Sequence, residues 1–179
     1  MSSPRSGGSV VARSIGFPPA ARGDARLLIL GSLPGRMSLE RQQYYAQPRN
    51  AFWPLMGRLF DAGPEHAYAE RLRRLAESRV ALWDVCASAK RPGSLDQKID
   101  RSSVTPNDFV SFFEKHRAIK LICFNGATAQ RLFMGLVAPG LSKEFPTTLR
   151  LPSTSPAHAS LDFERKLAAW TVILEALGK

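Results

Sequence analysis

Four short apolar segments, each followed by turn-forming residues, constrain the fold of this chain more than any other feature. The segments run from Arg26 to Leu30, Val80 to Trp83, Lys120 to Phe124 and Thr148 to Leu151. The first three are essentially continuously apolar, as expected for parallel strands that are covered on both faces. The turn residues that follow are Gly31-Ser32-Leu33-Pro34-Gly35, Asp84, Asn125-Gly126 and Pro152-Ser153. We therefore predict four buried strands.

Helical patterns lie between and after these segments. Apolar residues recur at helical spacing over five ranges: Asn50 to Phe60, Ala67 to Ser78, Pro106 to His116, Ala127 to Leu136 and Phe163 to Leu177. Thr105 or Asn107 would cap the third of these helices. Strands that alternate with helices predict an α/β fold, a three-layer α/β/α sandwich with a central four-stranded parallel sheet.

The length of 179 residues suits one domain with a sizeable core. We expect residues 1–15, which are rich in Ser, Gly and Arg, to form a disordered leader, and residues 16–179 to form a single domain. The polar segment from Ser88 to Thr105 is expected to be a long structureless loop, a feature that in compact domains is often functional. No apolar run approaches the roughly 20 residues of a membrane span. Because the leader also lacks an apolar core, we expect a soluble cytoplasmic protein.

The chain is strongly basic, with a formal net charge of +10 from 25 Lys and Arg against 15 Asp and Glu. A compact basic domain favours a polyanionic partner, above all nucleic acid; the alternative is a generally basic protein without such a partner. The two cysteines, Cys86 and Cys123, lie in or beside apolar segments and are expected to be small buried hydrophobic residues. Because no Cys or His spacing suits a metal, we expect neither a metal ion nor a cofactor.

The loop after the first strand is expected to form the ligand site, because open α/β sheets bind ligands at the carboxyl ends of their strands. The turn from Gly31 to Gly35 has neither the Lys-Ser/Thr pair of a P-loop nor a GxGxxG pattern, which argues against ATPases, kinases and dinucleotide-binding enzymes. The loop continues as QQYYAQPRNAFW over residues 42–53. Its aromatic residues could stack on a flat ring, and its amide and guanidinium groups could hydrogen-bond to polar edges.

These motifs resemble those of a known family. GSLPG (31–35) followed by QQYYAQPRNAFW (42–53) resembles the first signature of the hypoxanthine-DNA glycosylases, a branch of the uracil-DNA glycosylase superfamily. It also resembles the G-x-N-P-G…HPxNxFW signature of the mismatch-specific uracil-DNA glycosylases. LPSTSPAHA (151–159) resembles the second superfamily signature. LWDV (82–85), RPGSLD (91–96), PNDF (106–109) and FNG (124–126) match between them, so the resemblance covers nearly the whole chain after about Gly16.

The resemblance implies a monofunctional DNA glycosylase that excises deaminated bases, hypoxanthine foremost, with uracil and xanthine as further candidates. Such an enzyme initiates base excision repair by hydrolysing the N-glycosidic bond, using water rather than a lysine Schiff base. The target nucleotide must leave the double helix to be reached. The expected partner is DNA that contains deaminated bases, and we expect a monomer that does not bind membranes.

Leu33 is a departure from the superfamily pattern. It stands where several branches place a catalytic Asp or Asn, and an aliphatic side chain cannot activate water. The resemblance to the hypoxanthine branch instead assigns catalysis to Asn50. Gln47 is often His in that branch, so an amide replaces the imidazole and could still form hydrogen bonds. The alternative for Asn50 is that it only caps the helix that carries Phe52 and Trp53.

The other candidate site residues divide into two groups. The base-binding candidates are Gly31, Ser32, Leu33, Pro34, Tyr45, Phe52 and Asn125. The DNA-binding candidates are Gly35, Arg49, Lys90, Arg91, Ser153, Thr154, Ser155, Pro156 and His158. Hydroxyl, backbone and basic groups such as theirs contact phosphates without reading sequence.

Several of these residues have a structural alternative. Tyr45 would stack on the extruded base or pack within its loop, and Phe52 is equally suited to the core. Asn125 would hydrogen-bond to the base edge or cap the following helix. His158 suits a packed or capping position more than a proton shuttle. Lys90 suits a phosphate contact far better than the role of a lyase nucleophile.

Three rival functions stay open at this point. The first is a mismatch-specific uracil-DNA glycosylase, from which the aliphatic Leu33 and the PRN motif (48–50) differ. The second is a non-catalytic binder of damaged or single-stranded DNA, against which the retained Asn50 and Tyr45 argue. The third is a nucleotide-binding regulatory domain, for which the chain lacks a phosphate-binding loop.

Overall fold

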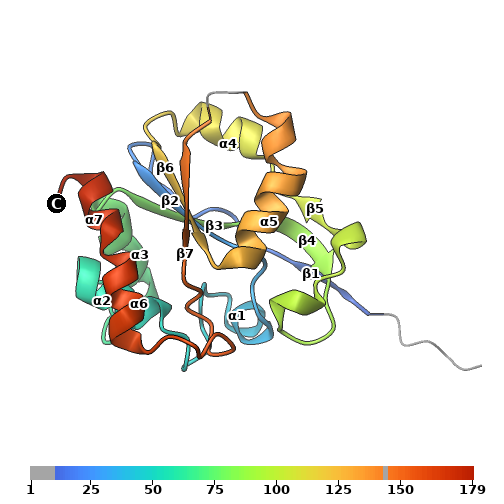
Figure 1. Cartoon of the computed structure of the whole chain (residues 1–179), viewed down its shortest axis with the longest axis horizontal. Coiled ribbons are helices and arrows are strands. Elements are labelled where there is room, and N and C mark those ends of the chain that lie inside the picture. Colours follow the sequence, from blue (N-terminus) through green and yellow to red (C-terminus); the bar gives the residue numbers. More distant parts are fainter. Residues whose placement is uncertain (1–10, 143–144) are drawn as a thin grey trace, which may run out of the picture.

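The computed structural model describes residues 11–142 and 145–179 and contains the predicted parallel sheet (Figure 1). Its four strands are β2 (Leu27–Gly31), β3 (Val80–Asp84), β6 (Leu121–Asn125) and β7 (Thr147–Leu151), in the order β3-β2-β6-β7. Every neighbouring pair is parallel. The register places Gly31 beside Asp84 and Asn125 beside Leu151, so the carboxyl ends of all four strands share one edge.

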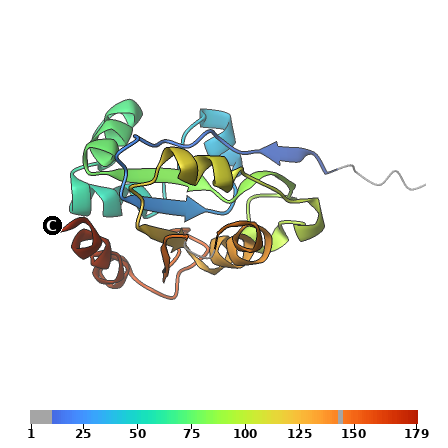
Figure 2. The same ribbon diagram turned by 90° about the horizontal axis from the view of Figure 1, so that it is seen from above.

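Helices cover both faces of this sheet, because side chains along each strand alternate between two apolar cores. Leu28 and Leu30 pack in the core that includes α4 (Phe109–Lys115) and α5 (Ala127–Leu136). Leu27 and Ile29 pack in the core formed with the helices of the other side, namely α2 (Phe52–Phe60), α3 (Tyr68–Glu77), α6 (Phe163–Trp170) and α7 (Val172–Leu177). Figures 1 and 2 show the two groups of helices on opposite sides of the sheet. The predicted three-layer sandwich is confirmed.

Helix boundaries differ from the predicted ones where side chains compete with the backbone. The third predicted helix begins only at Phe109, because Asp108, not Thr105 or Asn107, caps it by accepting a hydrogen bond from the Ser111 amide (3.0 Å). The C-terminal pattern is divided into α6 and α7 at Thr171, whose hydroxyl donates to the Leu167 carbonyl (2.8 Å). Such bonding to the preceding turn bends helices. A short helix that was not predicted, α1 (Arg36–Arg41), follows the first turn.

A second, antiparallel sheet corrects two predictions. It consists of β1 (Arg13–Ile15), β4 (Cys86–Lys90) and β5 (Thr105–Pro106), in the order β1-β4-β5. The segment from Ser88 to Thr105 is therefore not structureless; it also contains the 3₁₀ helices η1 (Asp96–Lys98) and η2 (Arg101–Ser103). Arg13–Ile15, expected in the disordered leader, pair with β4, and the Arg13 guanidinium donates to Ser88, Ser103 and Thr105. Residues 1–10 of that leader lie outside the described residues.

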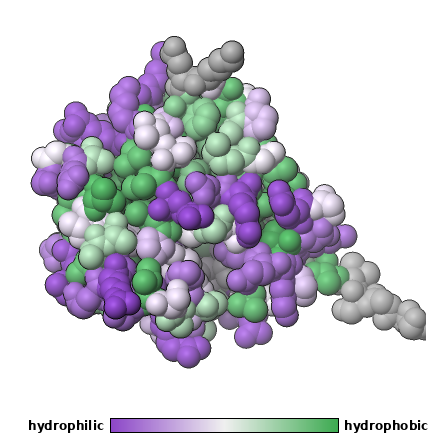
Figure 3. Space-filling model, in the orientation of Figure 1, coloured by the Kyte–Doolittle hydropathy of each residue, from purple (hydrophilic) through white to green (hydrophobic). Residues whose placement is uncertain are grey.

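Cys86 and Cys123 are buried free thiols, as expected, and burial raises the pKa of each to about 12. Within residues 11–142 and 145–179, no helix combines the length and apolar character needed to cross a membrane. Figure 3 shows hydrophilic residues over much of the face seen in Figure 1, with hydrophobic residues in small areas between them.

Candidate active site

The two signature regions meet at the carboxyl edge of the parallel sheet, and Thr154 joins them. The Ala51 amide, just after Asn50, donates to the Thr154 carbonyl (3.0 Å). The Asn125 side chain at the end of β6 donates to the Thr154 hydroxyl and accepts from the Thr154 amide, both at 2.9 Å. These three hydrogen bonds hold Ala51, Asn125 and Thr154, which are distant in sequence, in contact with one another.

This arrangement excludes the capping alternative for Asn125 and corrects the prediction for Thr154. Asn125 does not cap α5, because Gly126 occupies the cap position (φ 94°) and no side chain forms a capping bond there. Thr154 is only 1% exposed, and its hydroxyl accepts from Asn125, so this side chain is not a DNA contact. Asn125 is 8% exposed, and a contact between its amide and the base edge stays a prediction.

The first turn, Gly31 to Pro34, is buried and fixed to the strand beside it. The amides of Val85 and Cys86 donate to the carbonyls of Gly31 (2.9 Å) and Ser32 (3.0 Å). A methyl group on Gly31 would collide with the Asp84 carboxylate and would lie 3.1 Å from the Tyr45 hydroxyl. Glycine is therefore required at this strand end, where the Asp84 carboxylate and the Tyr45 hydroxyl approach the same point.

Arg91 is buried against this turn and donates hydrogen bonds to its carbonyls, which corrects its predicted role as a DNA contact. Its side chain is 1% exposed, and its guanidinium donates to the carbonyls of Leu33 (3.2 Å) and Pro34. It also pairs with Asp96 (3.4 Å), which in turn accepts a hydrogen bond from the Ser32 hydroxyl (2.6 Å). A planar group with five donors can satisfy several carbonyls of one tight turn, whereas an exposed arginine could not define its shape.

Tyr45 and Phe52 form a stacked pair beside the turn. Tyr45 has a left-handed backbone (φ 54°). The centroid of its ring lies 3.9 Å from the ring centroid of Phe52, and the interplanar angle is 20°. Phe52 is fully buried in the core, so its predicted contact with the base is wrong: Tyr45 covers its face. Tyr45 is half-buried, and its hydroxyl is buried without a hydrogen-bond partner among the described residues. Stacking of Tyr45 on a base stays a prediction.

Asn50 lies at the edge of the same site, in the turn that precedes α2. Its side-chain oxygen accepts from the Phe52 amide (2.9 Å) at the start of α2, although the N-cap position of that helix is Ala51 and carries no side-chain cap bond. The backbone amide of Asn50 donates to the Gln47 carbonyl (2.9 Å). The side-chain oxygen of Gln47 accepts from the backbone amide of Arg49. Asn50 is half-buried, and its side-chain nitrogen forms no hydrogen bond within the described part of the chain. A carboxamide oxygen has two lone pairs, so capping leaves it able to orient a water molecule.

The other predicted DNA contacts lie wholly or partly at the surface, and their roles stay predictions. Arg49, Lys90 and His158 are exposed, and Gly35, Ser153, Ser155 and Pro156 are half-buried. The hydroxyls of Ser153 and Ser155 accept from the amides two residues onward, each at 3.2 Å. These turns hold the two hydroxyls of the second signature loop near the surface, as phosphate contacts require.

Asp84 was expected at a strand end as a turn residue, but it was not among the predicted base-binding or catalytic residues. It ends β3 beside Gly31, is buried, and one of its carboxylate oxygens has no hydrogen-bond partner among the described residues. Burial, reinforced by the charge of Asp96 and opposed by Arg91, raises the pKa of Asp84 to about 7. The signal in the sequence was an acidic residue directly after a continuously apolar strand, where a buried carboxyl end was already predicted.

Asp84 should make the stability of the protein depend on pH. The folded protein keeps the Asp84 proton until about pH 7, whereas the unfolded chain releases it near pH 4, so stability falls as pH rises between these values. From pH 4 to pH 8, denaturant unfolding should show the unaltered protein losing about 2–4 kcal/mol relative to Asp84→Asn. Parallel stability profiles for the two proteins would contradict the buried protonated carboxyl.

One cluster of metal-ligand types occurs among the described residues, and it lies away from this site. Asp61, Glu65 and His66 follow the end of α2 that is opposite Asn50. Arg74 pairs with the Asp61 carboxylate and neutralises it.

The strand-end site itself offers carboxyl, amide, hydroxyl and phenol groups around a buried glycine turn, a set suited to hydrogen bonding with a small polar heterocycle.

Comparisons with known proteins agree with this arrangement. The family model described as "Uracil DNA glycosylase superfamily" matches residues 18–177. The chain is 36% identical over 159 residues to a protein of Methanosarcina acetivorans named hypoxanthine DNA glycosylase, covering 88% of this chain and 96% of the relative. It is 38% identical over 112 residues to a protein of the same name from Methanosarcina barkeri, covering 62% of this chain and 70% of the relative.

The fold also has a solved counterpart. A solution NMR structure of a Methanosarcina acetivorans protein assigned to the uracil DNA glycosylases superposes with a TM-score of 0.75 at 34% sequence identity. The likeness covers 94% of this chain and 100% of the solved chain. The match therefore extends through both signature loops and is not limited to the central sheet.

Proposed function

The chain belongs to the uracil DNA glycosylase superfamily, and from this premise we propose that it is a DNA glycosylase that excises hypoxanthine from DNA. Its action would begin base excision repair of deaminated adenine. Uracil and xanthine, which present the same kind of N–H and carbonyl edge, are secondary candidates. We propose a monomer that needs no cofactor.

One observation supports this function more than any other. Thr154 hydrogen-bonds to both Ala51 and Asn125, which brings the two signature loops together at the edge where α/β sheets bind ligands. The relatives at 36% and 38% identity carry the name hypoxanthine DNA glycosylase. The mismatch-specific uracil alternative shares the first signature but places a polar residue where this chain has the buried Leu33.

The proposed reaction is a hydrolysis at the sugar carbon C1′. The bond between C1′ and N9 of hypoxanthine breaks, and the base leaves with the electron pair while the sugar becomes oxocarbenium-like. Water adds its oxygen to C1′, one of its protons passes to the departing base through solvent, and the strand keeps an abasic sugar. Asn50 would orient the water, and preorganised dipoles at the strand ends would stabilise the charge on the base.

A panel of oligonucleotides tests the proposal. Purified protein is incubated with duplex and single-stranded oligonucleotides that carry hypoxanthine, uracil, xanthine or adenine, and abasic sites are cut with alkali. The expected result is fastest excision of hypoxanthine and no excision of adenine. Excision of uracil alone would favour the mismatch-specific alternative. Tight binding of every damaged strand without excision would favour the non-catalytic DNA binder.

Tyr45 provides a separate test of how the base is held. If its ring stacks on the extruded base, Tyr45→Ala should weaken binding of hypoxanthine DNA by about 1–3 kcal/mol. Tyr45→Phe should bind normally and be at least as stable as the unaltered protein, because the hydroxyl that it removes is buried without a partner. Fluorescence anisotropy and denaturant unfolding measure the two quantities. Equal binding losses in both variants would show that the hydroxyl, not the ring, is the functional group.

A further inference from the structure

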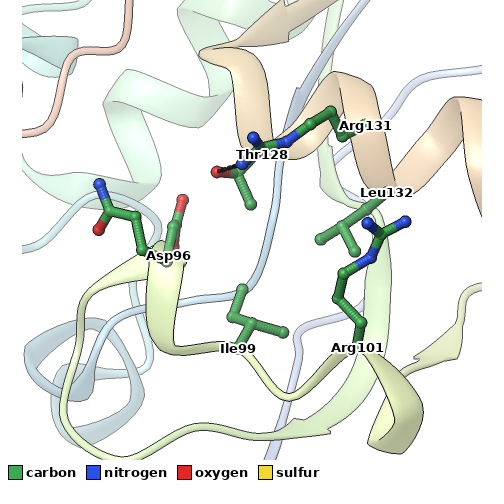
Figure 4. Close-up of a pocket in the computed structure, with 7 residues that line it drawn as sticks. Asp96, Ile99, Arg101, Thr128, Arg131 and Leu132 are labelled. Carbon is green, nitrogen blue, oxygen red and sulfur yellow. Dashed lines mark hydrogen bonds between the residues drawn. The ribbon is translucent and has the colours of Figure 1, made fainter.

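A cavity of about 200 Å³ lies beside the candidate active site, between α5 and the segment that joins β4 to β5 (Figure 4). Arg101 comes from η2 and Arg131 from α5, and Figure 4 shows both side chains at its border. Ile99 and Leu132 contribute buried apolar surface to the lining. The cavity thus combines an apolar wall with two basic groups from different elements.

Most N–H donors of Arg101 and Arg131 form no hydrogen bond with the residues that the structure describes. Both residues are exposed, and neither forms an ion pair with any residue that the structure describes. Arg131 donates to the Thr128 hydroxyl (3.2 Å), and a terminal nitrogen of Arg101 lies 3.5 Å from the position that a Cβ on Gly135 would occupy. Each guanidinium carries five N–H donors, so most of them are available to an anion. Arginine forks suit the oxygens of a phosphate.

Asp96 connects this cavity to the candidate active site. It lines the cavity, yet its carboxylate accepts from the Ser32 hydroxyl (2.6 Å) and pairs with Arg91 (3.4 Å). Its charge is therefore directed toward the first turn and not toward Arg101 or Arg131. Asp96 therefore lies between the turn that would receive the base and the cavity that carries the two arginines.

We propose that this cavity binds a nucleotide unit of the substrate strand next to the extruded nucleotide. A phosphate group lies between Arg101 and Arg131, and the attached sugar or base lies against Ile99 and Leu132. This inference rests on the proposed function for the presence of the DNA strand. The cavity adds a second, sequence-independent hold on that strand, which keeps its register fixed while the target base occupies the strand-end site.

The test compares two double variants with the same loss of charge. Arg101→Ala/Arg131→Ala removes the two cavity arginines. Arg26→Ala/Arg117→Ala removes two exposed arginines from the opposite edge of the sheet, before β2 and β6. Each is titrated with a duplex containing a tetrahydrofuran abasic-site analogue, which cannot lose a base, at several salt concentrations. Thermal unfolding of each variant checks that the fold is retained.

The cavity variant should bind this duplex roughly tenfold more weakly at low salt, as expected for one lost charge-assisted contact. Its log–log salt slope should be smaller in magnitude by about 0.9, the value for one phosphate. Because both arginines hold the same phosphate, each single variant should lose nearly as much as the double variant. An equal loss in the Arg26/Arg117 control, or no change in the cavity variant, would overturn the proposal.

A second titration separates a DNA strand from a free nucleotide, which offers the same phosphate chemistry. Deoxyadenosine monophosphate should compete with the duplex only at high concentration. If the cavity variant lost binding of this nucleotide but bound the duplex normally, the strand proposal would be wrong. Because these titrations measure binding without base release, a protein that failed to excise hypoxanthine would refute the proposed function without deciding the cavity.

Discussion

Asn50→Ala is expected to fold and to bind hypoxanthine DNA, yet to release the base about 10²–10³-fold more slowly, the effect of removing one preorganised polar group. The side-chain oxygen of Asn50 is fixed by the Phe52 amide (2.9 Å) at the meeting point of the signature loops. Its second lone pair can therefore orient water without a cost in side-chain ordering. Single-turnover excision measures the effect.

A matched variant separates catalysis from helix capping. Serine also caps helices well, so Asn50→Ser should keep nearly all of the stability, while Asn50→Ala loses about 0.5–2 kcal/mol. The shorter hydroxyl cannot place water as the carboxamide does, so Asn50→Ser should be nearly as slow as Asn50→Ala. Near-normal excision by folded Asn50→Ser would leave capping as the whole role of Asn50. Catalysis would then fall to backbone amides or to the second signature loop.

Arg91→Ala is expected to destabilise the protein by about 3 kcal/mol, the lower end of the cost of breaking a buried ion pair. The buried guanidinium donates to the carbonyls of Leu33 and Pro34, so its removal leaves both without this partner. Asp96 is partly exposed and can recover some solvation, which limits the loss. Urea unfolding measures the change, and excision should fall as well because the first turn loses its support.

Lys90→Ala is the control for Arg91. Lys90 is the preceding residue and is exposed, so its substitution should change the free energy of unfolding by less than about 0.5 kcal/mol. Arg91→Lys should fall between the two, because an ammonium group cannot reach both carbonyls with a planar fork. If Arg91→Ala were as stable as Lys90→Ala, Arg91 would be a surface residue, as first predicted from the sequence.

The central fold was predictable because local patterns and tertiary burial agree there. The β2, β3 and β6 segments are continuously apolar and each is followed by turn chemistry, so their boundaries were located to within one residue. The range Ala127–Leu136 was predicted with its observed limits. The strands β1, β4 and β5 were missed because they are short and pair only through long-range antiparallel contacts.

The location of the candidate site could be predicted from the sequence, but the contacts made by several of its residues could not. Asn50, Tyr45 and Asn125 were expected at the strand ends, and the structure places them there. Arg91 was misassigned because it lies in the polar segment from Ser88 to Thr105, which was expected to be a loop, whereas its partners Leu33 and Pro34 lie almost sixty residues earlier. Thr154 and Phe52 were misassigned for the same reason: burial by distant segments cannot be read from neighbouring residues.

The products formed from a duplex with one hypoxanthine opposite thymine test the central claim most directly. Mass spectrometry should show free hypoxanthine and an unbroken strand that carries an abasic site, and this strand should break only after treatment with alkali. That outcome identifies hydrolysis of the N-glycosidic bond without a lyase step. A strand that is bound but retains its hypoxanthine, at enzyme concentrations above that of the duplex, would contradict the assignment of this protein as a hypoxanthine DNA glycosylase.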